Sequence, residues 1–175
     1  MQDQEQASPE ERIRDTSCSS EYLDSMARKN ARTDRLIASH PNTSADTFSK
    51  LRYSHDDQTR INVTLNPNTP RSILIDLGRY FPREFLQNPA FDLTVLGDPD
   101  CLSGFYCNTL AAILRQPECP YSIVEWASDN YSKCDGYGLE VLIAISQNPT
   151  AGVSLIERLF QIDVARDISC SEGML

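Results

Sequence analysis

The sequence predicts an all-α protein, an α-solenoid of short helix–Pro loop–helix repeats. An Asn, Gln or His residue followed by proline recurs five times in the 175 residues, apolar residues keep fixed offsets from these prolines, and strand signals are poor. The five dipeptides are His40-Pro41, Asn66-Pro67, Asn88-Pro89, Gln116-Pro117 and Asn148-Pro149.

Three apolar columns accompany the dipeptides. Four residues before each proline lie Ile37, Val63, Phe85, Ile113 and Ile145. Seven residues after it lie Phe48, Leu74, Leu96, Val124 and Ile156, and ten after it lie Leu51, Leu77, Pro99, Ala127 and Leu159. Offsets of seven and ten differ by three, so these two columns share one face of a helix.

Each dipeptide ends a helix, because a residue before proline is pushed out of the α region. The first helices of the five units are expected to end near Ser39, Leu65, Gln87, Arg115 and Gln147. The second helices are expected to cover roughly residues 44–53, 70–79, 91–97, 120–128 and 152–160.

Single residues in the loops also have expected roles. Thr43 and Thr69 are expected to cap the second helices, and Pro70 and Pro120 suit a first helical position. The side chain of His40 is expected to hydrogen-bond loop backbone, as the Asn residues of its column would.

The domain organisation follows from the repeat. Residues 1–20 are expected to be a disordered or loosely attached polar arm, residues 21–168 one domain of about five irregular repeats, and residues 169–175 a frayed tail. Two turn-rich insertions, residues 97–105 and 128–138, lengthen the spacing between repeats.

Composition excludes some classes of function. The chain has 25 acidic and 16 basic residues, a net charge of -9, which disfavours binding to nucleic acid or to an anionic membrane. No apolar run spans a bilayer and no secretory signal is seen, so a cytoplasmic location with free thiols on the six cysteines is expected.

The block LRYSHDDQTRINVTLNPNTPRSILIDLGRY, residues 51–80, resembles the bacterial leucine-rich repeat variant family. In that family a short helix, an Asn-Pro-Asn-Thr-Pro loop and a second helix recur. The resemblance implies a right-handed superhelix, similar to HEAT arrays, and says little about function. A member of the family carries a cysteine cluster for a [4Fe–4S] centre ahead of its repeats, but this chain has only Cys18 there.

No catalytic or metal site is expected. Only His40 and His55 could serve nucleophilic machinery, and both have plainer roles in a loop and a turn. Cys101, Cys107, Cys119 and Cys134 lack C-x-x-C spacing, and no phosphate-binding glycine loop occurs. A disulfide between Cys101 and Cys107 and a metal-dependent redox protein stay open as alternatives.

Charge and aromatic residues point instead to a protein partner. Residues 116–175 carry nine acidic and three basic residues and hold several Tyr and the only Trp, a composition typical of binding hot spots. The predicted binding residues are Glu118, Tyr121, Glu125, Trp126, Asp129, Tyr131, Asp135 and Tyr137, with Tyr131 and Tyr137 expected to be exposed. The chain is therefore predicted to be a non-enzymatic interaction module for a basic protein, with an inhibitor or immunity protein against a basic toxin as the alternative.

Overall fold

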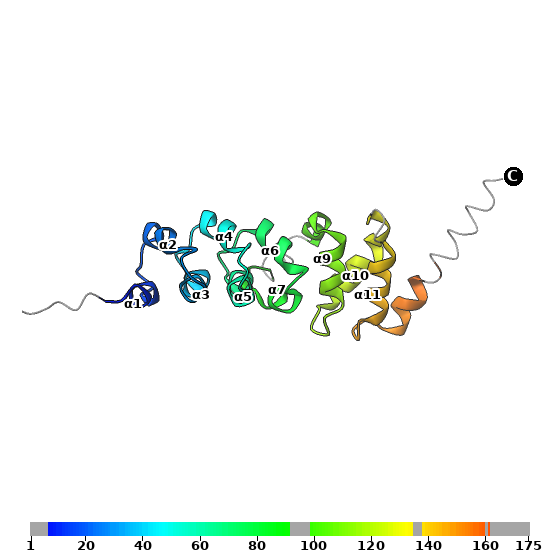
Figure 1. The fold of residues 1–175 in the computed structure, drawn as a ribbon. Coiled ribbons are helices and arrows are strands. Elements are labelled where there is room, and N and C mark those ends of the chain that lie inside the picture. The colour runs from blue at the N-terminus through cyan, green and yellow to red at the C-terminus, as the bar shows by residue number, and fades with distance from the viewer. Residues whose placement is uncertain (1–6, 92–98, 135–137, 160, 162–175) are drawn as a thin grey trace, which may run out of the picture. The chain divides into compact units, whose positions relative to one another are not determined.

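Helices joined by turns make up the part of the chain that its computed structural model describes, which comprises residues 7–91, 99–134, 138–159 and 161. No strand occurs in these ranges. The predicted all-α class is therefore confirmed, and Figure 1 shows the succession of short helices. The predicted tail over residues 169–175 lies outside the described residues.

The chain divides into two compact units, residues 1–101 and residues 102–175. The sequence instead predicts one domain over residues 21–168. The boundary falls inside the insertion at residues 97–105, where turn-forming residues interrupt the repeat register.

Unit 1 contains seven labelled α-helices in two rows (Figure 1). The first helices of successive repeats pack on one another, α1 on α3, α3 on α5 and α5 on α7. In the second row α2 packs on α4. The helices are α1 (Pro9–Arg14), α2 (Ser20–Met26), α3 (Ala31–Ser39), α4 (Ala45–Leu51), α5 (Asp57–Leu65), α6 (Arg71–Gly78) and α7 (Pro82–Gln87).

Unit 2 is built on the same plan. Its helix α11 (Gly138–Gln147) packs on α9 (Cys107–Leu114), and both contact α10 (Tyr121–Asn130). The short 3₁₀ helix η2 (Tyr131–Lys133) follows α10, and residues 153–159 are helical. The 3₁₀ helix η1 (Pro99–Gly104) spans the boundary between the units in sequence.

The helices end at or next to the residues that the five Pro dipeptides predict. Helices α3, α5, α7 and α11 end at the predicted residues Ser39, Leu65, Gln87 and Gln147, and α9 ends one residue early at Leu114. After α3, α5 and α7 the next residue has extended backbone, at His40 (ψ 138°), Asn66 (ψ 123°) and Asn88 (ψ 120°). The predicted second helix over residues 91–97 falls largely outside the described residues.

The apolar columns form the core. Every residue of the column four before proline is at most 1% exposed. The column ten after proline is also buried wherever its side chains are described, and Ile156, in the column seven after, is the one half-buried exception. The repeat read from the sequence is therefore the packing unit of the fold.

Asn66 joins two neighbouring repeats through its buried side-chain amide. Its Nδ2 donates to the carbonyl oxygens of Ala38 (2.9 Å) and His40 (3.0 Å), which belong to the preceding repeat. Its Oδ1 accepts from the backbone N–H of Asn68, which closes the loop of its own repeat. One side chain therefore satisfies carbonyl groups that the end of α3 leaves without helical partners.

The same contact recurs along the chain. Asn88 donates to the oxygens of Thr64 and Asn66, and in unit 2 Asn148 donates to the oxygens of Leu114 and Gln116. Gln116 differs, since its Nε2 donates to Ala112 O within its own helix. We call this series of side-chain amides the asparagine ladder.

His40 takes the place of Asn in the ladder. Its Nδ1 accepts from the N–H of Asn42 (3.0 Å), which makes Nε2 the protonated nitrogen that donates to Asp15 O (3.0 Å). These bonds agree with the loop role expected from its column.

The predicted loose arm over residues 1–20 is wrong for its described part. Residues 9–14 form α1 behind a capping box between Ser8 and Glu11, and Ile13 is 1% exposed in the core. Asp15 then accepts from the N–H of Ser17, in the manner of Asn66. Ile13, the ion pair of Glu10 with Arg32 (2.8 Å) and the bond of His40 to Asp15 O dock this short helix, which composition alone does not reveal.

The loop threonines have another role than the one expected. The hydroxyl groups of Thr43 and Thr69 donate to the carbonyl oxygens of Ile37 and Val63, and so cap the end of the first helix. Ser44 is the N-cap of α4. Donation by a hydroxyl suits a helix C-terminus, where carbonyl groups lack partners.

Loss of a buried amide of the asparagine ladder is expected to destabilise the fold more than loss of an exposed amide. Replacing Asn66 with Ala removes two buried donors and leaves carbonyl groups of Ala38 and His40 short of a partner, so we expect Asn66→Ala to lower the free energy of unfolding by about 2–4 kcal/mol. Urea denaturation followed by circular dichroism measures this loss.

Asn68→Ala is the matched control. Asn68 is exposed, and its Nδ2 donates only to Pro41 O. Its loss is expected to cost about 1 kcal/mol. Equal effects of the two substitutions would contradict a special role for the buried amide.

Candidate interaction surfaces

One face of α10 carries three of the eight predicted binding residues. Tyr121, Glu125 and Asp129 follow one another at intervals of four, so they lie on the same side of the helix. All three are exposed, Tyr121 to 48%. Trp126 is half-buried beside them, and Glu118 is exposed in the preceding loop.

Asp129 is tied to the rest of unit 2. Its carboxylate forms an ion pair with Arg158 (3.2 Å), and Arg158 also donates to the hydroxyl of Ser128 (2.7 Å). This pairing reduces the charge that Asp129 offers to a partner. Among the predicted acidic residues, Glu125 is the exposed carboxylate at the centre of the α10 face.

The expected exposure of Tyr131 is wrong. The side chain is 6% exposed at the start of η2, and it closes the core where α11 packs on η2. A β-carbon at Gly138 would lie 3.1 Å from Tyr131 O, so glycine permits this close approach. The predicted binding residues Asp135 and Tyr137 lie outside the described residues.

The cysteines offer no constellation for metal chemistry in the described part of the chain. Cys18, Cys107, Cys119 and Cys134 are free thiols. No group of three His, Cys, Asp or Glu side chains converges there. Burial raises the pKa of the Cys119 thiol to about 12, so this cysteine is not a nucleophile at neutral pH.

Unit 1 has a second surface, which the sequence analysis missed. It lies where the second helix of each repeat turns into the next repeat, at residues 27–30, 52–56 and 79–81. We call these segments the junction turns. They hold Arg28, Arg52 and Arg79 and the exposed Tyr53 (70%) and Tyr80 (55%).

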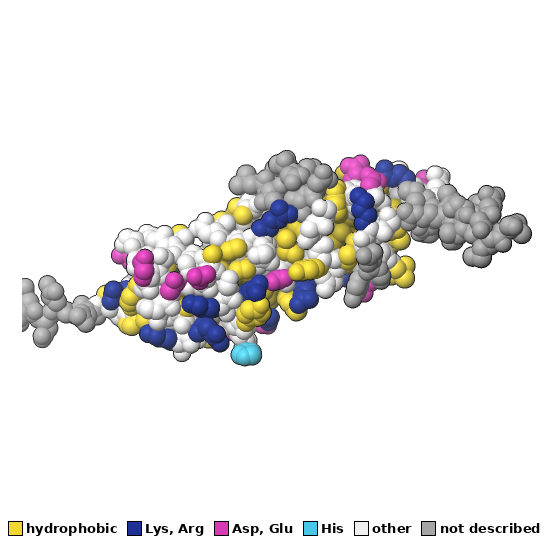
Figure 2. All heavy atoms as spheres, turned by 90° about the horizontal axis from the view of Figure 1, so that it is seen from above, with side chains coloured by type: hydrophobic (Ala, Val, Ile, Leu, Met, Phe, Trp, Pro, Cys, Tyr) yellow, Lys and Arg dark blue, Asp and Glu magenta, His cyan; other side chains and the backbone are white. Residues whose placement is uncertain are grey.

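Two hollows lie along the junction turns. The first, of about 500 Å³, is lined by Arg28, Asp34, Lys50, Tyr53, His55 and Asp56 among others. The second, of about 450 Å³, is lined by residues that include Arg52, Tyr53, Arg60, Asp76, Arg79 and Tyr80. The space-filling view shows Lys and Arg side chains, several Asp and Glu, and hydrophobic side chains mixed along this part of the molecule (Figure 2).

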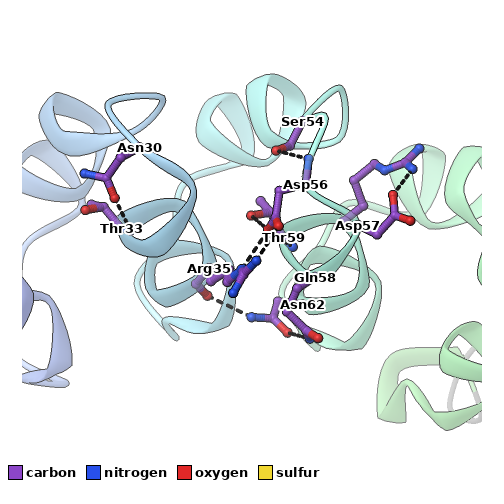
Figure 3. Close-up of polar contacts among 10 residues, drawn as sticks. Asn30, Thr33, Arg35, Ser54, Asp56, Asp57, Gln58, Thr59 and Asn62 are labelled. Carbon is purple, nitrogen blue, oxygen red and sulfur yellow. Dashed lines mark hydrogen bonds and ion pairs between the residues drawn. The ribbon is translucent and has the colours of Figure 1, made fainter.

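Asp56 accepts more hydrogen bonds than the other carboxylate of the first hollow, Asp34. Arg35 holds both of its oxygens, at 2.5 and 2.8 Å, and Thr59 donates to it through its N–H and its hydroxyl (Figure 3). The bonds from Arg35 hold the pKa of Asp56 well below its ordinary value. Asp56 therefore stays ionised and fixed as the N-cap of α5.

Asp34 has the opposite environment. It is 7% exposed and accepts from the N–H of Arg28, a residue in the left-handed region (φ 64°). Burial raises the pKa of this carboxyl group above its ordinary value, although the bond from Arg28 acts against the shift. The carboxylate fixes a turn that a non-glycine residue rarely adopts.

Arginine and aromatic rings are stacked around the second hollow. The guanidinium of Arg52 lies 4.5 Å from the ring centre of Tyr53, and that of Arg79 lies 4.5 Å from the ring centre of Tyr80. Arg60 lies over Tyr80 (5.8 Å) and Phe81 (5.1 Å). Arg52 is also paired with Asp76 (2.7 Å). These contacts hold the cations in place.

A local charge count could have located this surface from sequence. Residues 28–91 hold ten Lys and Arg against six Asp and Glu, a net charge of +4 in a chain of -9. The total charge of the chain hides this excess, because the acidic first 27 residues and the acidic residues 116–175 outweigh it.

Comparison with protein-family models, with curated proteins and with solved structures finds no match to this chain. Within the described residues, no helix is both long enough and apolar enough to cross a bilayer. The surfaces themselves are therefore the basis for a functional conclusion.

Opposite pKa shifts at Asp56 and Asp34 predict opposite responses to acid. The pKa of Asp56 is depressed, so its stabilisation is complete above the unfolded-state pKa of about 3.9 and is lost as pH falls below it. The pKa of Asp34 is raised, so its ionisation destabilises the fold as pH rises through and above about 3.9. The free energy of unfolding in urea, measured between about pH 3 and pH 6, tests both signs.

Asn substitutions isolate each carboxylate. Asp56→Asn keeps an N-cap acceptor, and we expect its stability to fall less on acidification than that of the wild type. Asp34→Asn is expected to fall more steeply than the wild type. Parallel curves for all three proteins would contradict both assignments.

Proposed function

We propose that this protein is a non-enzymatic interaction module that binds a basic protein surface through the outer face of α10. The observation that carries the proposal is the alignment of Tyr121, Glu125 and Asp129 on one exposed side of that helix, next to Trp126. Tyr and Trp supply large contact area at low entropic cost, and a carboxylate between them selects a cationic partner.

The framework suits such a role. Helices stacked in rows and held by the asparagine ladder support the proposal of an α-solenoid of the leucine-rich repeat variant type, whose extended surface carries function through grafted side chains. The apolar columns and the Asn-Pro loops are the features in common.

The environments of the two histidines support a non-catalytic role. Both ring nitrogens of His40 are occupied by backbone groups, and His55 is exposed in a turn. The free thiols at Cys18, Cys107, Cys119 and Cys134 are consistent with a reducing, cytoplasmic location.

Trp126 provides a direct readout of the proposed surface, because it is the only tryptophan. We expect a basic protein that binds the α10 face to change its fluorescence. Proteins retained from a lysate of the source organism by the wild type, but not by Tyr121→Ala/Glu125→Lys, are purified and titrated with the single-Trp signal. The expected loss of affinity in the variant is at least about tenfold.

Glu140→Lys is the charge-matched control. Glu140 is exposed on α11, and its substitution gives the same change in net charge without touching α10. Binding that weakens equally in both variants would reflect net charge alone. A partner whose affinity is indifferent to salt and to Glu125 would overturn the proposal.

A further inference from the structure

We propose that the two hollows along the junction turns of unit 1 form one groove that binds an extended acidic segment of a protein partner. This surface is separate from the α10 face in residues, in unit and in charge, so it does not depend on the function proposed above.

The hollows are neighbours because they share a wall. Tyr53, Ser54 and His55 line both of them. The hollow of about 500 Å³ and the one of about 450 Å³ therefore adjoin this single turn. Each has room for a side chain or two, and a segment crossing the Tyr53 turn would place side chains in both.

The groove is cationic after its internal pairs are counted. Its lining contains five cations, Arg28, Lys50, Arg52, Arg60 and Arg79, against three carboxylates, Asp34, Asp56 and Asp76. Two residues outside the lining leave this balance unchanged, because Arg35 adds one positive charge beside Asp56 and Asp57 adds one negative charge beside Arg60. A net charge of +2 remains, with His55 taken as neutral.

Two of these cations are available to a ligand. Neither Lys50 nor Arg79 forms an ion pair with another described residue, and both are exposed. Lys50 lines the first hollow and Arg79 the second. A carboxylate in each hollow would complete a charge-assisted pair at either end of the groove.

The arginine side chains of the second hollow are ordered before a ligand binds. Arg52 is fixed by Asp76 and by its stacking on Tyr53, while the Nε of Arg52 and that of Arg60 are buried without a hydrogen-bond partner. Ordering these side chains in advance lowers the entropic cost of binding. Planar guanidinium groups suit the planar carboxylate of Glu or Asp.

An acidic peptide fits this groove better than a nucleic acid does. A phosphate backbone is bound by a long run of cations, each neutralising one phosphate. Here the excess is two charges in a chain of -9, which repels a polyanion at longer range. A short segment with two spaced carboxylates matches the excess and reaches both hollows.

Fluorescence anisotropy of a labelled peptide tests the proposal. The probe is a peptide of about ten residues in which glutamate alternates with alanine, long enough to cross both hollows when extended. We expect it to bind the full chain, to bind more weakly as salt rises, and to lose about tenfold in affinity with either Arg79→Gln or Lys50→Gln. Tyr53→Ala is expected to weaken binding as well.

Arg14→Gln is the control variant. Arg14 is an exposed arginine at the end of α1, at the opposite end of its repeat from a junction turn. Circular dichroism shows whether each variant is folded, and the use of two exposed groove residues keeps the test decisive if one variant is not. Unchanged affinity in both folded groove variants would overturn the proposal.

Two further probes separate the other occupants. The same peptide with lysine in place of glutamate is expected not to bind, and binding of it at equal affinity would overturn the charge argument. A labelled thymidine oligonucleotide of similar length is expected to bind more weakly than the glutamate peptide. Tighter binding of the oligonucleotide, lost in Arg79→Gln, would assign the groove to nucleic acid and reject an acidic peptide.

Discussion

The hydrogen bonds of one buried amide decide how these repeats stack. A short helix leaves up to four carbonyl groups without helical partners, and in a stack these groups face the neighbouring repeat, where water is scarce. The Nδ2 of Asn66 reaches back to two such carbonyls while its Oδ1 holds its own loop closed. Any residue at this position needs a donor on one side and an acceptor on the other. Asn meets this requirement, and so does neutral His40.

This constraint divides the edges of a repeat into two kinds. At the proline edge, the side chains of Asn66, Asn88 and Asn148 are committed to backbone groups of the neighbouring repeat, and Gln116 is the exception. At the opposite edge, the stacking of repeats restricts the side chains of the junction turns less. Exposed tyrosines and arginines collect there, stacked on one another and facing solvent. In repeat proteins, an edge whose side chains do not hold the stack is free to vary, and the groove proposed here lies at such an edge.

Much of the fold could be predicted because its determinants are local. Proline blocks the helix at the preceding residue, and columns three apart mark one face, so helix ends and core positions such as Ile37 and Val63 follow from spacing alone. The features that the sequence does not predict depend on contacts between segments far apart in the chain. Ile13 docks α1 although its neighbours are polar, and Tyr131 is buried by the return of the chain at Gly138. The hollows of unit 1 depend on which turns lie side by side, and only the stacked structure shows that Tyr53 is shared between them.

The net charge of the chain does not predict the charge of a single surface, because it is summed over all surfaces. The chain carries -9, yet residues 28–91 carry +4, and the groove within them keeps +2 after its own ion pairs are removed. Screening at physiological salt limits the reach of a charge to about 8 Å, less than the length of a short helix. A partner bound at either proposed surface would therefore respond to the charge of the groove or of the α10 face, and the total charge would act only during its approach. Under these proposals, electrostatic specificity depends on which carboxylates in each repeat are already paired, as Asp56 and Asp76 are, and on which cations remain unpaired among the described residues, as Lys50 and Arg79 do.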